Sequence, residues 1–316
     1  MFATRRSAVR LLVSSLLSFA VVAPAVAAET PDTSGALTAK LNAYIGCLNR
    51  LSGRAFESRE RYFSWAAKSG PTGKERIVYG TYTIYDTKDC RAGVEKANAL
   101  EPHEPDLETA ASAYADAVGK LEPLLKETDD YYTQENYKDD KMAKGKALHP
   151  RLIAAWDAFA DADRKLRSGV ETIKDRQSTE QLAAIERSEG RKARYQIEAT
   201  MIDAKRVARA AGADKPDLAA LTAALETYEK TVAANEAFTE GERNMKIGSM
   251  FQSNAKSFLV TAKQLMRRLR DKTPYSSGDK MLLSNAGSGW MVQGSPPRLQ
   301  RDYNQLVDTY NRGPGF

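Results

Sequence analysis

Residues 129–150, DDYYTQENYKDDKMAKGKALHP, concentrate side chains that could bind a ligand or transfer a proton. The segment holds three tyrosines, five carboxylates, four lysines and one of the chain's two histidines. His149 lies close in sequence to Asp139 and Asp140, and a carboxylate–histidine pair is a usable acid–base unit. The same residue types also cap helices and satisfy one another in buried corners. The segment is therefore a candidate ligand site or a structural polar corner.

Helical geometry predicts how this corner is arranged. A helix that ends near Tyr131 and another that begins at Asp139 or Asp140 would bring four polar residues together, namely Tyr132, Tyr137, Asp140 and His149. Tyr131 and Tyr132 are adjacent, so helical geometry points them about 100° apart and at most one should face the core.

A buried His149 would need a hydrogen-bond partner. It lies seven residues from both Met142 and Trp156, so all three share one helix face. If that face is buried, a tyrosine hydroxyl or a carboxylate of the same corner is the nearest candidate partner.

Cys47 and Cys90 are the only cysteines. In an oxidising compartment they should form a disulfide, which would close a loop of about 44 residues and contribute about 4 kcal/mol on the loop-entropy model. The alternatives are two buried thiols, or a zinc site completed by His103 and His149. No C-x-x-C or H-x-x-x-H pair supports zinc. We predict a disulfide, no metal and no cofactor.

Two classes of function remain open. The sequence has no G-x-S-x-G, no H-E-x-x-H and no glycine-rich phosphate loop. This favours a non-catalytic binding or interaction module. The alternative is an envelope enzyme that uses Asp140 and His149 as its acid–base pair.

The first 27 residues have the features of a secretory signal peptide. Arg5, Arg6 and Arg10 precede a short apolar run at 11–23, and Ala25-Val26-Ala27 has the small-x-small pattern of a cleavage site. We predict a periplasmic protein with a flexible N-terminus at 28–35 and no transmembrane segment in its mature form. The twin arginines leave both the Sec and the Tat route open.

Cleavage would also weaken the case for nucleic-acid binding. Loss of three arginines leaves 44 basic residues against 41 acidic ones, a net charge of about +3. Such a balance in an exported chain does not indicate a nucleic-acid partner.

A basic face is expected near the end of the helix at 250–270. Lys263, Arg267 and Arg270 lie away from its apolar stripe. They could contact anionic lipid heads or cell-wall polymers. They could equally form a solvated face whose charge complements the helix dipole.

Helical periodicity dominates the chain and must position these residues. Apolar stripes predict helices over about 37–67, 107–131, 140–173, 217–240 and 250–270, and a short terminal helix from Pro296. Ser178 and Gln181 form a capping-box pattern that predicts a further helix over 178–212. Residues 77–85 are strand-like but have no partner strand, so we expect an ordered loop or short helix there. Residues 272–295, with Trp290, read as a long loop.

These elements predict an all-α fold in which one domain, residues 36–316, is built from long antiparallel helices. NAYIGCLNR at 42–50 and NQLVDTYNR at 304–312 share a pattern. Either two amphipathic helices resemble each other by chance, or the two terminal helices pack together and close the bundle.

Several segments resemble the YiiG-like family of exported bacterial proteins, a domain of unknown function. They are LNAYIGCLNRL, GPTGKERIVYGTYTI, the cysteine of YDTKDC, YYTQENYKDDKMAKGKALHP and YNQLVDTYNR, which together span about 37–311. The resemblance implies a helical envelope protein and transfers no catalytic residue. Many members are lipid-anchored, but AYIGC around Cys47 is not a lipobox, so we expect a soluble periplasmic form.

Overall fold

Helices account for the regular structure of the computed structural model, which describes residues 33–212, 216–241, 247–285 and 287–313. These ranges contain nine α-helices and no β-strand, which confirms the all-α fold class. The predicted signal peptide lies outside the described residues. The first helix begins at Thr33, before the predicted domain boundary at residue 36.

An N-terminal lobe is built from α1 (Thr33–Phe63), α2 (Thr87–Asn98), α3 (Pro105–Thr133) and the part of α4 (Ala143–Glu189) up to Ile173. The predicted apolar stripe of α1 is buried in its core, from Leu37 to Leu51. A disulfide joins Cys47 on α1 to Cys90 on α2, with the two Cα atoms 5.3 Å apart. This is the predicted pairing.

A C-terminal lobe surrounds a second buried cluster. It contains α5 (Ala193–Gly212), α6 (Leu218–Gly241), α7 (Ser249–Arg270), α8 (Ser277–Ser284) and α9 (Pro296–Asn311). Aromatic residues fill its centre, where the Tyr228 hydroxyl donates to the carbonyl oxygen of Ala255 at 3.0 Å.

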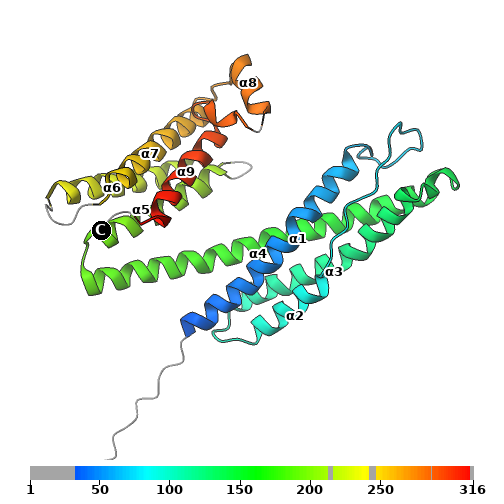
Figure 1. The fold of residues 1–316 in the computed structure, drawn as a ribbon, viewed down its shortest axis with the longest axis horizontal. Coiled ribbons are helices and arrows are strands. Elements are labelled where there is room, and N and C mark those ends of the chain that lie inside the picture. Colours follow the sequence, from blue (N-terminus) through cyan, green and yellow to red (C-terminus); the bar gives the residue numbers. More distant parts are fainter. Residues whose placement is uncertain (1–32, 213–215, 242–246, 286, 314–316) are drawn as a thin grey trace, which may run out of the picture.

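The long helix α4 connects the lobes. Its 47 residues extend about 70 Å at 1.5 Å per residue. Figure 1 shows α4 running the length of the molecule, with α1–α3 along one half and α5–α9 over the other. Beyond Ile173, α4 leaves the first core and packs against α5.

The helix start predicted at Ser178 is wrong. α4 passes through Ser178 and Gln181 without interruption and ends at Gly190, where φ is 77°. Glycine adopts a positive φ at little cost, so the chain turns there and α5 follows. A serine with a glutamine three residues later caps a helix only where the preceding backbone is non-helical.

The two long segments that the sequence predicted to lack regular helices differ in structure. Residues 71–86 form the expected ordered loop, which is held where the Arg61 Nε donates to the Gly80 carbonyl oxygen at 2.9 Å and Thr81 Oγ1 donates to the Leu125 carbonyl oxygen at 2.8 Å. The predicted long loop at 272–295 instead contains α8 and the 3₁₀ turn Gly289–Met291.

The two terminal helices do not pack together. α9 lies against α7 and α5 in the C-terminal lobe, whereas α1 belongs to the N-terminal lobe. The alternative in which they close the bundle is therefore wrong, and the shared pattern is that of two separate amphipathic helices. An amphipathic period determines which face of a helix is buried, but it does not determine which element covers that face.

Candidate functional site

The corner between α3 and α4 differs from its prediction in two respects. A 3₁₀ turn, Asn136–Lys138, occupies the corner, and α4 begins at Ala143 rather than at Asp139 or Asp140. Tyr131 and Tyr132 are also both buried, so the expectation that at most one faces the core is wrong. The residues of the corner supply a contact to each of these two tyrosines: Asp140 binds Tyr131, and the Tyr137 ring packs near Tyr132.

Asp140 caps α4 and binds Tyr131. Its carboxylate accepts hydrogen bonds from the amides of Ala143 and Lys144 at 3.1 and 2.9 Å, and from the Tyr131 hydroxyl at 2.8 Å. These donors, the Lys144 amide foremost, hold the pKa of Asp140 below its usual value. Burial, together with the bond to Asp140, raises the pKa of Tyr131 to about 12.

Tyr132 and Tyr137 contact each other and belong to an aromatic cluster. Their ring centroids are 6.2 Å apart, and the Tyr132 ring also lies 4.9 Å from Trp65 and 6.4 Å from Tyr62. A Cβ at Gly145 would come within 2.6 Å of the Tyr132 hydroxyl, so a glycine is required for this close approach. Burial raises the pKa of Tyr132.

His149 is buried, and its partners come from outside the corner. Its Nδ1 lies 2.9 Å from the Tyr62 hydroxyl and its Nε2 lies 3.2 Å from the Lys68 carbonyl oxygen. A carbonyl only accepts, so we assign the proton to Nε2 and the acceptor role to Nδ1. The structure describes both His149 and Asp140 and places no hydrogen bond between them, so it does not assemble the proposed acid–base pair.

The basic residues near the end of α7 are partly paired. Lys263 forms an ion pair with Glu229, and Arg270 pairs with its neighbour Asp271 at 2.8 Å. Arg267 is exposed.

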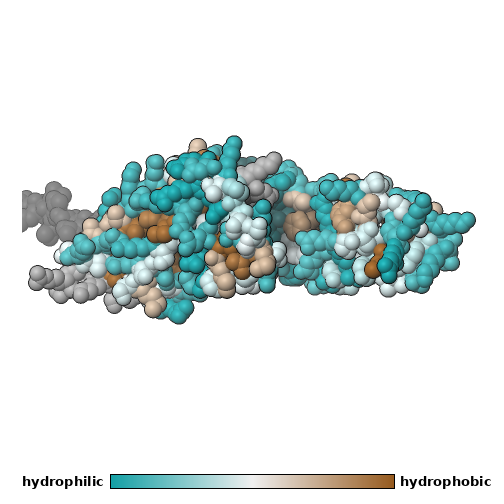
Figure 2. All heavy atoms as spheres, turned by 90° about the horizontal axis from the view of Figure 1, so that it is seen from above, coloured by the Kyte–Doolittle hydropathy of each residue, from teal (hydrophilic) through white to brown (hydrophobic). Residues whose placement is uncertain are grey.

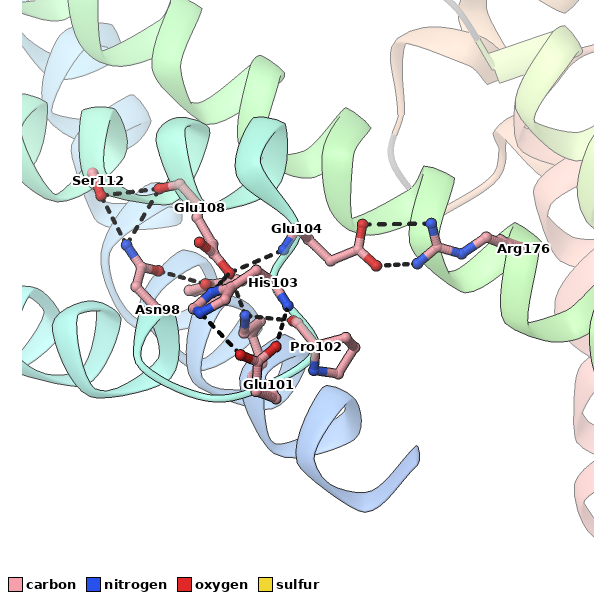
Figure 3. A network of polar contacts seen from close by, with 10 residues as sticks. Asn98, Glu101, Pro102, His103, Glu104, Glu108, Ser112 and Arg176 are labelled. Carbon is pink, nitrogen blue, oxygen red and sulfur yellow. Dashed lines mark hydrogen bonds and ion pairs between the residues drawn. The ribbon is translucent and has the colours of Figure 1, made fainter. Parts of the chain in front are cut away.

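A second polar network, which the sequence did not reveal, lies at the other end of the N-terminal lobe (Figure 3). The Lys40 side chain is 0% exposed, and its Nζ donates to the Pro102 carbonyl oxygen at 2.8 Å and forms an ion pair with Glu108. The same Glu108 carboxylate accepts from the Glu104 amide at 3.0 Å and contacts His103 Nδ1 at 3.3 Å. Burial alone would raise the pKa of Glu108, but these donors, led by Lys40, hold it below its usual value.

The network ties three helices together. The Tyr44 hydroxyl of α1 donates to the Asn98 side-chain oxygen of α2 at 2.5 Å, and Asn98 Nδ2 donates to Ser112 Oγ of α3 at 3.0 Å. Burial, followed by the charge on Glu108, raises the pKa of Tyr44. This end of the lobe is therefore held rigidly by mutually satisfied polar groups.

An ion pair extends the network to α4. Glu104, at the start of α3, binds both terminal nitrogens of Arg176, one of them at 3.4 Å (Figure 3). His103 contacts Glu101 through Nε2 at 3.3 Å, and its side chain is 54% exposed.

A cleft of about 960 Å³ opens beside this ion pair. It lies between the start of α1, the α2–α3 connection and the part of α4 that leaves the first core. The hydrogen-bonding and charged groups of its lining are Thr38, Glu104, Arg176, Gln177, Glu180 and Gln181.

The buried charged residues of this network are engaged with one another. Lys40 and Glu108 are satisfied by fixed partners, so neither presents a free base or nucleophile to the cleft. In the described ranges, no group of three or more His, Cys, Asp or Glu side chains could hold a metal ion. None of the helices in those ranges is both long and apolar enough to cross a membrane.

One sequence signal could have located the network. Lys40 lies on the apolar stripe of α1, three residues after Leu37 and four before Tyr44. A charged residue at such a position must be paired when the stripe is buried. The identity of its partner, 68 residues away, has no local signal.

The fold and the site together define an all-helical, two-lobed protein with a polar cleft and a rigid buried ion pair beside it. The chain belongs to the family described as "Protein of unknown function (DUF3829)", which it matches over residues 35–312. It is 38% identical over 292 residues to the "Uncharacterized protein YiiG" of Escherichia coli (strain K12), covering 90% of this chain and 82% of that protein. The resemblance to YiiG-like proteins is thereby confirmed. No solved structure matches the chain significantly.

Proposed function

We propose that this chain is an exported, non-catalytic binding protein of the cell envelope, and that its cleft takes a polar ligand. The cleft is the observation that carries the proposal. Its volume of about 960 Å³ lies within the range of about 300–1,000 Å³ typical of small-molecule sites. Export is supported by the basic n-region, apolar run and cleavage pattern of residues 1–27.

The lining favours a ligand rich in hydroxyl and amide groups. Gln177 and Gln181 can each donate and accept hydrogen bonds, and Glu180 adds further oxygen acceptors. The buried Lys40–Glu108 pair and the Glu104–Arg176 pair fix the walls of the cleft before a ligand arrives, which reduces the entropy lost on binding. Short glycan–peptide fragments of the cell wall have this chemistry.

Muropeptides released by digestion of the cell wall are the probe that tests the proposal. We expect the purified protein to bind them in saturation-transfer NMR, and the Gln177→Leu/Gln181→Leu variant to lose the signal. Gln305→Leu, an exposed glutamine change on α9, is the matched control and should bind normally. If the double variant retains binding, or the wild type shows none, the cleft does not have the proposed role.

A further inference from the structure

The helix α8 contains no buried residue. Met281, Leu282 and Leu283 follow one another along it, and Met281 is 70% exposed. Apolar side chains in a surface helix usually pack against a core, which is what stabilises a helix this short. In α8 the Met281 side chain remains available to a partner, and Leu282 and Leu283 are half-buried beside it.

A second apolar group lies next to α8. The 3₁₀ turn that follows it carries Trp290 and Met291, and Met291 is 51% exposed. We call Met281, Leu282, Leu283, Trp290 and Met291 the α8 tip. Figure 1 shows α8 at the far end of the C-terminal lobe, away from α1–α3. The face of the molecule seen in Figure 2 is mostly hydrophilic, with separate apolar patches.

The α8 tip is held in place although it covers little core. Ser276 and Asp279 form a reciprocal capping box at the start of α8, with both bonds at 3.1 Å. The Trp290 indole donates to the Gly287 carbonyl oxygen at 3.1 Å, and the Arg301 guanidinium lies 3.6 Å from the centre of the Trp290 ring. A partner would therefore meet a preformed surface.

The stretch that leads into α8 is basic. Between 267 and 280 it carries Arg267, Arg268, Arg270, Lys272 and Lys280. The acidic residues in that stretch are Asp271, which pairs with Arg270, and Asp279, which caps α8. Five basic residues against two acidic ones leave this stretch, which adjoins the α8 tip in the sequence, with a net charge of +3.

We propose that the α8 tip is a peripheral docking surface for an anionic lipid bilayer. Flexible apolar side chains would enter the boundary between headgroups and acyl chains, the indole of Trp290 would lie at the headgroup level, and Arg267, Lys272 and Lys280 would contact lipid phosphates. A protein partner alone would not require this combination of exposed methionines, an interfacial tryptophan and unpaired cations. Few side chains insert, so binding is reversible and weakens with salt.

Flotation with vesicles of phosphatidylglycerol and phosphatidylcholine in equal parts tests the proposal. We expect the wild-type protein to bind these vesicles and to bind pure phosphatidylcholine at least tenfold more weakly. Met281→Ser/Met291→Ser should lose at least tenfold in affinity for the anionic vesicles. Trp290 fluorescence should shift to shorter wavelength on binding, and Trp290→Phe should abolish that shift.

Met250→Ser is the matched control, because Met250 is 66% exposed but lies at the opposite end of α7. It should bind as the wild type does, and unchanged melting curves would show that the exposed Met→Ser changes leave the fold intact. Equal binding by Met281→Ser/Met291→Ser, or no wild-type binding, would overturn the proposal.

Discussion

At the scale of single residues, two buried groups of the N-terminal lobe are paired across long sequence separations. His149 binds Tyr62 from 87 residues away, and Lys40 binds Glu108 from 68 residues away. The period of the sequence places His149 on one helix face with Met142 and Trp156, and burial of that face requires a partner for His149. The sequence does not predict which tyrosine is the partner, because Tyr62 and the tyrosines of the corner carry the same hydroxyl group. Only the tertiary structure determines which of them reaches His149.

We predict that His149→Ala destabilises the protein by about 2 kcal/mol. The change leaves the buried Tyr62 hydroxyl without its acceptor, and an unsatisfied buried polar group costs about 1–3 kcal/mol. The other histidine provides the control, since His103 is 54% exposed and His103→Ala should cost less than about 1 kcal/mol. Urea unfolding followed by circular dichroism measures both. Equal effects of the two changes would contradict a structural role for His149.

At the scale of elements, sequence patterns located helices better than they located helix ends. The helix predicted over 217–240 begins where expected: the Asp217 carboxylate accepts hydrogen bonds from the amides of Ala219 and Ala220 at 2.9 and 3.3 Å at the start of α6. Ser178 has an equally good capping pattern, yet it lies inside α4. The difference is that the residues before Ser178 already form a helix packed against the first core, and tertiary packing outweighs a local cap.

We therefore predict different effects on stability for two substitutions that each remove a potential helix-capping side chain. Asp217→Ala should destabilise the protein by about 1 kcal/mol, because it removes an N-cap. Ser178→Ala should change the free energy of unfolding by less than about 0.5 kcal/mol, because alanine is the better helix former at an interior position. Chemical denaturation resolves the two values. A loss for Ser178→Ala as large as that for Asp217→Ala would mean that α4 breaks at Ser178 in solution.

At the scale of the whole molecule, the two cores are separate and are joined by α4. Four ion pairs join α4 to α5: Lys205 and Arg209 of α5 each bind both Glu171 and Asp175 of α4, at 2.5–3.3 Å. The sequence predicted a single bundle because the apolar stripes of all the helices have the same period. No local pattern indicates which of the two cores a given stripe packs into. Polar contacts between lobes hold them less firmly than an apolar interface would.

This junction should respond to pH. Hydrogen bonding from Arg209, with the charge of Lys205, holds the pKa of Asp175 below its usual value. Because the folded-state pKa is the lower one, the stabilisation is full above the unfolded-state pKa of about 3.9 and is lost as pH falls through the folded-state value. The wild-type radius of gyration measured by X-ray scattering should therefore increase below about pH 4 while helical circular dichroism persists.

Asp175→Asn should show part of this increase already at neutral pH, because Glu171 alone is then left to hold Arg209 and Lys205. Asp161→Asn is the control, since the pKa of Asp161 is also lowered, by Lys165 and Arg164, but all three residues lie on α4 within the N-terminal lobe. Its radius of gyration at neutral pH should equal that of the wild type. If Asp175→Asn also scatters like the wild type at neutral pH, the ion pairs do not hold the lobes together, and buried apolar contacts around Ile185 at the end of α4 must do so instead.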